Sequence, residues 1–325
     1  MKVTKEHFRG CLLGGATADA RAYGVRQDGK DLICDNTQMT SFTLDGLVWA
    51  ADRAASKGVY AYIPCLFYSY QKWYYTQTGN LADKNYGFIL GGELLEWDEL
   101  FARRGNGVTS LTALAGSIDN KFGTIKNRIN NSNNCGCVTR VAPIGLYFWN
   151  NPKTAFRIGS ESGALTHGHI DAILSSGYYA AFMAYIVSGH TLRAAANNAL
   201  ALLKAEQGHE NTSVLIEKAL ELSASNIALN KAVGQLGQGF MACECAALAT
   251  YMCLKYEEDF DGAILATMSF SGNNRGVAAV TGNALGTFYN ATVIPTSWIN
   301  DVELADLMVH GADLLLERTD VTENG

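Results

Sequence analysis

The sequence has little proline and few charged residues. It contains 4 Pro in 325 residues, and charged residues make up 17% of it, whereas hydrophobic residues make up 48%. Disordered chains show the opposite balance, so this composition excludes disorder for most of the chain. No Pro-, Gly- or Ser-rich stretch is long enough to act as a linker, and we expect residues 1–325 to form a single domain.

An excess of basic residues is also missing. Lys and Arg total 25 against 31 Asp and Glu, a net charge of -6, which excludes nucleic-acid binding by bulk charge. Any phosphate group must therefore be bound by particular residues at one site. Residues 1–8 are too short and too polar for a signal peptide, and apolar runs such as 178–187 fall short of a membrane span. We expect a cytoplasmic protein with no membrane partner.

The 8 cysteines form no Cys-x-x-Cys pair, the usual signature of a zinc or redox site. Cys135 and Cys137 flank one loop. Cys243 and Cys245 lie in a helical pattern, where a spacing of two residues turns the chain by roughly 200°. They therefore cannot face one ion together, and we expect reduced, mostly buried thiols.

The spacing of apolar residues is helical nearly throughout, and no alternating stretch predicts a sheet of any size. Residues 170–187 are apolar or small on every face, as in a helix buried inside a helical core. The sequence therefore predicts an all-α fold, one compact bundle of many helices. Further helices are expected at residues 191–205, 213–223, 240–256, 260–270, 277–289 and 302–316.

Polar segments rich in Gly and Asn lie between the predicted helices. Loops that carry unusual polar residues on a rigid frame are where ligands usually bind, so we expect these segments to converge on one cleft. Small-residue turns are predicted at residues 10–24, 31–37, 103–109, 130–143, 166–169 and 271–276.

Several of these segments, in this order, resemble the ADP-ribosylglycohydrolase family. Residues 10–20 are similar to its opening G-x-L-x-G-x-A-x-G-D-A helix, and residues 35–43 to its D-D-T-Q-M-T-L-F-T segment. Residues 131–146 resemble N-x-S-x-G-C-G-x-V-M-R-V-A-P-I-G-L, followed by the Thr-His pair at 166–167. Later segments complete the resemblance: residues 239–244 are similar to G-W-V-A-E-E and residues 271–283 to S-G-D-S-D-S/T-x-x-A-I-A-G-N.

The resemblance implies an all-helical fold with two magnesium ions in one cleft. It also implies hydrolysis of the bond between ADP-ribose and a protein side chain or small acceptor. Mg²⁺ prefers hard oxygen ligands, and a pair of such ions can orient the ribose and the attacking water. In the family these ligands come from a T/S-D-D-T segment near the start and a D-x-D-T/S segment near the end.

This sequence departs from the family at most of these ligand positions. Residues 34–36 read Cys-Asp-Asn, and residues 273–276 read Asn-Asn-Arg-Gly. Among the expected ligands, only Asp35 is unchanged. The amides of Asn36 and Asn273 carry no negative charge, and Gly276 has no side chain. The guanidinium at 275 brings a permanent cation. We therefore expect no binuclear magnesium site and no other metal cofactor.

The degenerate cleft positions are the candidate catalytic residues: Asp35, Asn36, Asn273 and Arg275. We hypothesise that Arg275 takes the place of a metal ion and pairs with Asp35 across the cleft, since Arg binds carboxylates through two hydrogen bonds. The alternative is that Arg275 points into solvent from a loop.

The segment around residue 136 is, by resemblance, the one that wraps ADP-ribose, because small residues let main-chain amides approach a pyrophosphate or ribose. Arg140 in the same segment has two open roles, ligand contact or bonding to helix-end carbonyls. The candidate ligand-binding residues are Asn131, Ser132, Cys135, Gly136, Cys137, Thr166 and His167.

Three further polar residues lie in or near predicted helices: Asp19, Thr166 and His167. Thr166 is placed to cap the long buried helix that follows, and His167 either reaches a phosphate near that helix start or packs as a structural residue. Asp19 lies in an apolar helix where the family also has Asp, and a local interaction with Arg21 is the simpler interpretation.

Three functions follow from the resemblance and the substitutions. The first is a hydrolase that still removes ADP-ribose, with one weakly held metal or without metal, and with Asp35 as general base. The second, which we favour, is a pseudoenzyme that binds an ADP-ribose-like small molecule or an ADP-ribosylated protein. The third is an interaction role with an unused cleft. The sequence does not identify the acceptor.

Overall fold

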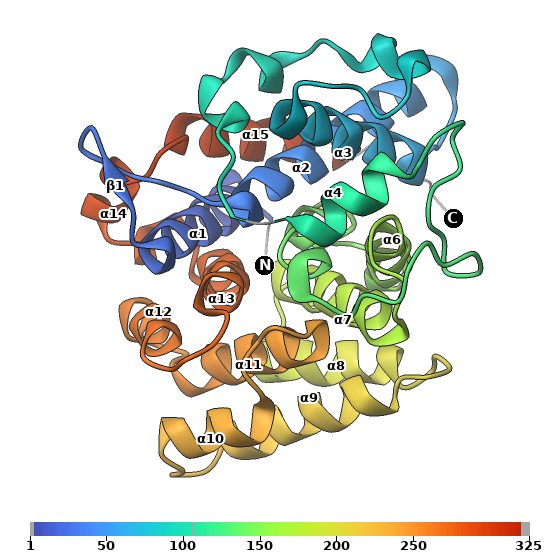
Figure 1. Cartoon of the computed structure of the whole chain (residues 1–325). Helices are drawn as coiled ribbons and strands as arrows, with labels where there is room; N and C mark the ends of the chain where they lie inside the picture. Colours follow the sequence, from blue (N-terminus) through green and yellow to red (C-terminus); the bar gives the residue numbers. More distant parts are fainter. Residues whose placement is uncertain (1–2, 106, 320–325) are drawn as a thin grey trace.

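The computed structural model describes residues 3–105 and 107–319 and confirms the predicted all-α fold (Figure 1). The first half of the chain contributes α1 (Lys5–Tyr23), α2 (Asp35–Lys57), α3 (Tyr62–Thr78), α4 (Val108–Ala115), α5 (Ala142–Tyr147) and α6 (Pro152–Ala164). The second half contributes α7 (Ile170–Val187), α8 (Leu192–Leu203), α9 (Glu210–Ser223), α10 (Leu229–Leu236), α11 (Ala242–Lys255), α12 (Phe260–Met268), α13 (Asn274–Tyr289), α14 (Thr296–Asp301) and α15 (Ala305–Glu317).

Short 3-10 helices and one small hairpin connect the long helices. Within the described ranges, the only sheet pairs two-residue strands, β1 (Arg26–Gln27) and β2 (Lys30–Asp31). The absence of alternating patterns in the sequence is consistent with so small a sheet. The 3-10 helices are η1 (Lys84–Ile89), η2 (Glu93–Glu96), η3 (Asp98–Phe101), η4 (Cys135–Cys137) and η5 (Ala291–Val293).

Predicted and observed helices agree closely in the second half of the chain. The helix expected at 170–187 is α7 with the same bounds, and nearly all of its residues are buried. By length and composition α7 passes a test for a membrane span, but 89% of it is buried inside the fold, as expected of a core helix. α10 and α14 were not predicted; the short apolar stripe of α10 lies between Gly- and Ser-containing turns.

The glycines of α1 hold it directly against α13, and the predicted turn at residues 10–24 is therefore wrong. This segment continues α1 to Tyr23, and Gly24 ends the helix at a left-handed φ of 68°. A side chain added at Gly10 or Gly14 would strike backbone of α13, at Gly286 and Gly282 respectively. The helix tolerates these glycines because close packing outweighs their low helix propensity, about 1 kcal/mol per residue.

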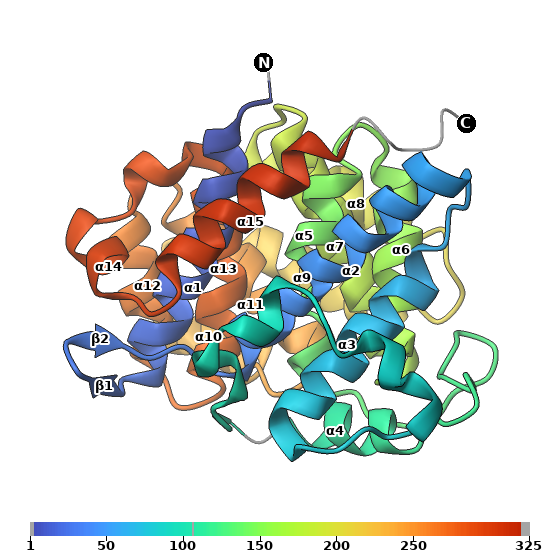
Figure 2. The ribbon, with the colours of Figure 1, turned by 90° about the horizontal axis from the view of Figure 1, so that it is seen from above.

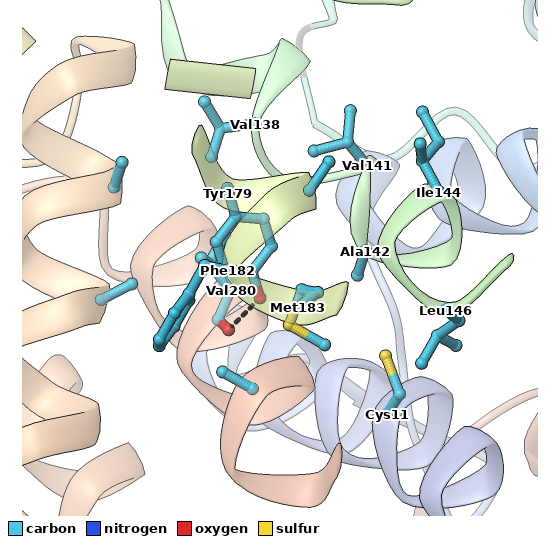
Figure 3. Close-up of a cluster of buried hydrophobic side chains, with 14 of the residues drawn as sticks. Cys11, Val138, Val141, Ala142, Ile144, Leu146, Tyr179, Phe182, Met183 and Val280 are labelled. Carbon is cyan, nitrogen blue, oxygen red and sulfur yellow. Dashed lines mark hydrogen bonds between the residues drawn. The ribbon is translucent and has the colours of Figure 1, made fainter. Parts of the chain in front are cut away.

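The central core lies where α1, α5, α7 and α13 meet (Figure 3). Tyr179 of α7 is fully buried, and its hydroxyl donates to the carbonyl of Val280 in α13 at 2.6 Å. This bond satisfies the one polar atom of a large apolar side chain. Cys11 of α1 and Ile144 of α5 lie in the same cluster.

α15 lies across α1 and α2 near the end of the described chain (Figure 2). Arg9 of α1 holds it through a two-bond ion pair with Asp313, at 2.7 Å for each bond. All 8 cysteines lie in the described part of the chain, and all are buried and free of disulfides, as expected.

Candidate functional site

The candidate site is a cleft of about 320 Å³, formed where four of the predicted polar segments converge. These are the start of α2, the segment that leads into α4, the segment around η4, and the start of α13. Of the six predicted turns, 10–24 and 166–169 contribute no lining residue. The cleft is lined by Asp35, Asn36, Met39, Trp73, Gly107, Val108, Thr109, Ser110, Asn134, Cys135, Gly136, Thr139, Asn273 and Arg275.

Asp19 lies beneath the cleft and fixes the start of α2. It is fully buried in α1, and its carboxylate accepts four hydrogen bonds. Cys34 donates twice, from its backbone N–H at 2.9 Å and from its thiol at 2.8 Å. The amide of Asn36 donates at 3.1 Å and the hydroxyl of Thr37 at 2.7 Å. These bonds direct the Asn36 amide down toward Asp19.

Arg21, two residues further along α1, makes no contact with Asp19. Its guanidinium pairs with Asp31 at 3.4 Å and lies 4.9 Å from the centre of the Trp298 ring. The predicted interaction between Asp19 and Arg21 is therefore wrong. The two residues point to different neighbours, because residues two apart on a helix do not share a face.

Asp35, the first residue of α2, is covered on one side by the chain before α4. Its backbone N–H donates to the carbonyl of Arg104 at 3.1 Å. Gly105, at φ 81°, lies so close to the carboxylate that any side chain there would strike it. The guanidinium of Arg104 is held in turn by a largely buried ion pair with Glu303.

The surroundings of Asp35 favour its protonated form. Burial raises the pKa of Asp35, and the negative charge of Asp19 raises it further. A hydrogen bond with Cys34 and the positive charge of Arg275 act in the opposite direction, but the pKa stays above its ordinary value.

Arg275 lies in the cleft but forms no direct pair with Asp35. No carboxylate of the described residues lies within ion-pair distance of its guanidinium, which lies 5.3 Å from the centre of the Tyr23 ring. The hypothesised two-bond pair across the cleft is therefore not formed. The alternative, in which Arg275 points into solvent from a loop, does not describe it either. Arg275 is half-buried and lines the same cavity as Asp35.

Asn273 uses its side chain to hold the start of α13. Its amide oxygen accepts from the N–H of Gly276 at 3.3 Å and so caps the helix. Its amide nitrogen donates to the sulfur of Cys135 at 2.7 Å and to the carbonyl of Gly239 at 3.2 Å. Both ends of the amide are thus engaged by the protein itself.

The predicted ligand-binding segment contributes only part of its residues to the cleft. Cys135 and Gly136 line it. Asn131 is exposed outside it, and Ser132 lies behind the wall, where its hydroxyl contacts that of Thr109 at 3.2 Å. Cys137 is fully buried, and burial raises the pKa of its thiol to about 11.

Thr166 and His167 form a buried chain with Arg140 behind Gly136. Arg140 donates to the Thr166 hydroxyl at 2.7 Å, and that hydroxyl contacts Nδ1 of His167 at 2.7 Å. Because an Arg can only donate, the hydroxyl accepts from Arg140, and the direction of its bond with Nδ1 follows the tautomer of the ring. Burial, helped by the charge of Arg140, lowers the pKa of His167 to about 3. Nε2 lies beside Gly136.

Arg140 has the structural role that the sequence left open. It is fully buried, donates to the carbonyl of Ser162 in the last turn of α6 at 3.2 Å, and lies 4.2 Å from the centre of the Tyr70 ring. It does not line the cleft.

The predicted cap at Thr166 is wrong. His169 precedes α7, and its ring Nδ1 accepts from the N–H of Asp171 at 3.2 Å. The hydroxyl of Thr166 is occupied by Arg140 and His167 instead.

Three lining residues were not anticipated from the sequence: Met39, Trp73 and Ser110. Met39 follows Asp35 by one helical turn, and this spacing could have revealed it. Trp73 belongs to the aromatic stretch at residues 60–75. It is fully buried apart from its edge on the cleft, and its indole N–H donates to Gln38 at 3.3 Å. No sequence signal marks Ser110.

The cleft offers one carboxylate, one guanidinium, and several hydroxyls and amides. Among its described lining residues, Asp35 is the only acid and Arg275 the only base, so their formal charges cancel. A search of the described residues found no group of three or more His, Cys, Asp and Glu side chains arranged to hold a metal ion. Thr109, Ser110 and Asn134 provide hydrogen-bonding groups of the kind that recognise sugar hydroxyls.

Comparisons with known proteins agree with the architecture. A family model described as ADP-ribosylglycohydrolase matches residues 1–324. A solved structure titled "ADP-ribosylglycohydrolase-related protein complex" is similar, with a TM-score of 0.65 and 17% identity, over 98% of this chain and 100% of that chain. At this identity the likeness shows the fold. A search of curated proteins found no match.

Proposed function

The chain belongs to the ADP-ribosylglycohydrolase family, and we propose that it binds an ADP-ribose-like ligand, free or attached to a protein, with little or no hydrolysis. The observation that carries this proposal is the set of side chains in the cleft. Asp35 is its single described carboxylate, and Arg275 places a permanent positive charge in the same cavity.

These residues do not fit a pair of magnesium ions. Two such ions need several anionic oxygen ligands, whereas the amide of Asn36 is directed toward Asp19 and the amide of Asn273 caps α13. The carboxylate of Asp19 already accepts four hydrogen bonds. The charge of Arg275 would also repel a cation in the cleft.

The same side chains suit an anionic sugar ligand. Arg275 offers a guanidinium that no described carboxylate pairs with, and a phosphate oxygen is its natural partner. Thr109, Ser110 and Asn134 line the same cleft, and their hydroxyls and amide are groups of the kind that bind ribose hydroxyls. Small glycines at the wall, such as Gly136, let a ligand approach the main chain.

Binding is tested by calorimetry with ADP-ribose in EDTA and again with magnesium. We expect saturable binding in EDTA and no added effect of magnesium on affinity or on thermal stability. The Arg275→Ala variant should bind at least about tenfold more weakly, because it loses a charged hydrogen bond. Arg103→Ala is the matched control, since Arg103 is exposed nearby and does not line the cleft. Stabilisation of the wild-type protein by magnesium alone would contradict the proposal.

Restoring the family's carboxylates is a complementary test. The triple variant Asn36→Asp, Asn273→Asp and Arg275→Asp should gain stabilisation by magnesium and release of ADP-ribose from a modified protein. If it folds and gains neither, the cleft has lost more than its metal ligands.

A second candidate function is hydrolysis with Asp35 as general base, without metal or with one weakly held ion. The raised pKa of Asp35 favours it, because a general base works best when its pKa lies near the working pH. Release of ADP-ribose in EDTA by the wild-type protein, lost in Asp35→Asn, would establish this function over the first.

A further inference from the structure

A second cavity, of about 700 Å³, lies away from the cleft, between α6, the first half of α7 and the chain that follows α8. Figure 1 shows α6, α7 and α8 next to one another. No residue lines both cavities. We call this second cavity the side groove, and its volume lies within the range of small-molecule sites.

The floor of the side groove is apolar. Phe156 of α6 and Leu174 of α7 are buried there, and Ile170 and Leu202 are half-buried beside them. A hydrocarbon group that displaces water from such an apolar floor is bound more tightly by roughly 0.8 kcal/mol for each CH₂ that becomes buried.

The rim of the side groove is basic. Arg128, Lys153 and Arg157 line it and are exposed, whereas Glu206 is its only described acid. Arg157 pairs with Glu161 of the same helix at 3.3 Å. The side chains of Arg128 and Lys153 form no hydrogen bond or ion pair with any described residue. The groove is thus locally positive in a chain whose net charge is -6.

We propose that the side groove binds an amphipathic organic anion, with a hydrocarbon tail on the apolar floor and an acidic headgroup at the basic rim. Apolar burial supplies most of the affinity, and the two unpaired cations select the charge of the headgroup. The site is separate from the ADP-ribose-like ligand of the cleft and does not depend on it.

Calorimetry with decanoate, kept below its micelle concentration, tests the proposal on the full chain. We expect one saturable site for decanoate, with affinity lower by about fourfold for each CH₂ removed in octanoate and hexanoate. Decyltrimethylammonium, with an alkyl tail one carbon longer and the opposite charge, should bind at least about tenfold more weakly. ADP-ribose should not compete. Equal binding of decanoate and decyltrimethylammonium, or unsaturable uptake of decanoate, would overturn the proposal.

Two variants locate the site. Lys153→Glu should weaken decanoate binding by about tenfold, whereas Lys231→Glu should leave it unchanged. Both lysines are exposed in the first turn of a helix, α6 and α10 respectively, so the two changes are matched in charge and setting. Ala205→Trp, at an exposed lining position after α8, should fill the groove and abolish binding. If decanoate binds Lys153→Glu and Ala205→Trp as it binds the wild type, it binds elsewhere and the proposal fails.

Discussion

Replacing His167 with Asn is expected to make the protein less sensitive to acid. The ring is buried with a pKa of about 3, against an ordinary value of 6.5. As the pH falls below 6.5, the unfolded chain therefore binds a proton that the folded chain does not, and the free energy of unfolding falls. Each pH unit costs about 1.4 kcal/mol, so acidification from about pH 7 to pH 5 should cost the wild type about 2 kcal/mol through this one residue.

The assay is urea unfolding followed by tryptophan fluorescence at several pH values in this range. In His167→Asn the amide oxygen can accept from the Thr166 hydroxyl in place of Nδ1. The variant starts less stable because the ring is missing, but it should lose about 2 kcal/mol less on acidification. His310→Asn is the control, since His310 is exposed.

Other titrating groups do not obscure this comparison. Burial lowers the pKa of His7, so His7 also makes the free energy of unfolding fall on acidification. Asp35 has a raised pKa, so it makes the free energy of unfolding rise on acidification. Both are present in the wild type and in the variant. If His167→Asn and the wild type lose the same free energy between pH 7 and pH 5, His167 is not held neutral, and burial does not lower its pKa as described.

Three further substitutions test the packing beside the cleft and between α1 and α13. Each is measured by urea unfolding. Gly105→Ala should destabilise the protein by about 1–3 kcal/mol, because the backbone at Gly105 is left-handed and the new methyl group would strike Asp35. Gly29→Ala is the control and should cost less, because Gly29 is also left-handed but has open space around it. Gly282→Ala should cost at least about 2 kcal/mol by separating α13 from α1, and a cost near zero would contradict the backbone contact. Asp19→Asn should cost about 2–3 kcal/mol, because its amide cannot accept from both groups of Cys34; an unchanged stability would show that these bonds contribute little.

The helices of the second half of the chain were predictable because their apolar patterns are long and regular. Residues 170–187 are apolar on every face, and only a buried helix accommodates that pattern. At residues 10–24 the glycine content alone wrongly predicted a turn, although the resemblance of residues 10–20 to the family's opening helix indicated the observed structure. This helix depends on contact with Gly282 and Gly286, about 270 residues away, and no local pattern reports such a contact.

The candidate site was predictable to the extent that it lies on loops. Asp35, Cys135 and Arg275 stood out by motif and line the cleft. Side-chain direction was not predictable: the sequence suggested a pair between Arg275 and Asp35, whereas the guanidinium lies over Tyr23. Ser110 was missed because one serine in a small helix carries no pattern of its own.

The contact between α1 and α13 joins the two ends of the sequence. The amide of Asn283 donates to the carbonyl of Cys11 at 2.8 Å, across 272 positions of sequence. During synthesis on the ribosome, α1 emerges more than two hundred residues before its partner helix α13 is made. Until then its glycine-lined face is open to other chains, so a translation product that stops before α13 should require chaperones or aggregate.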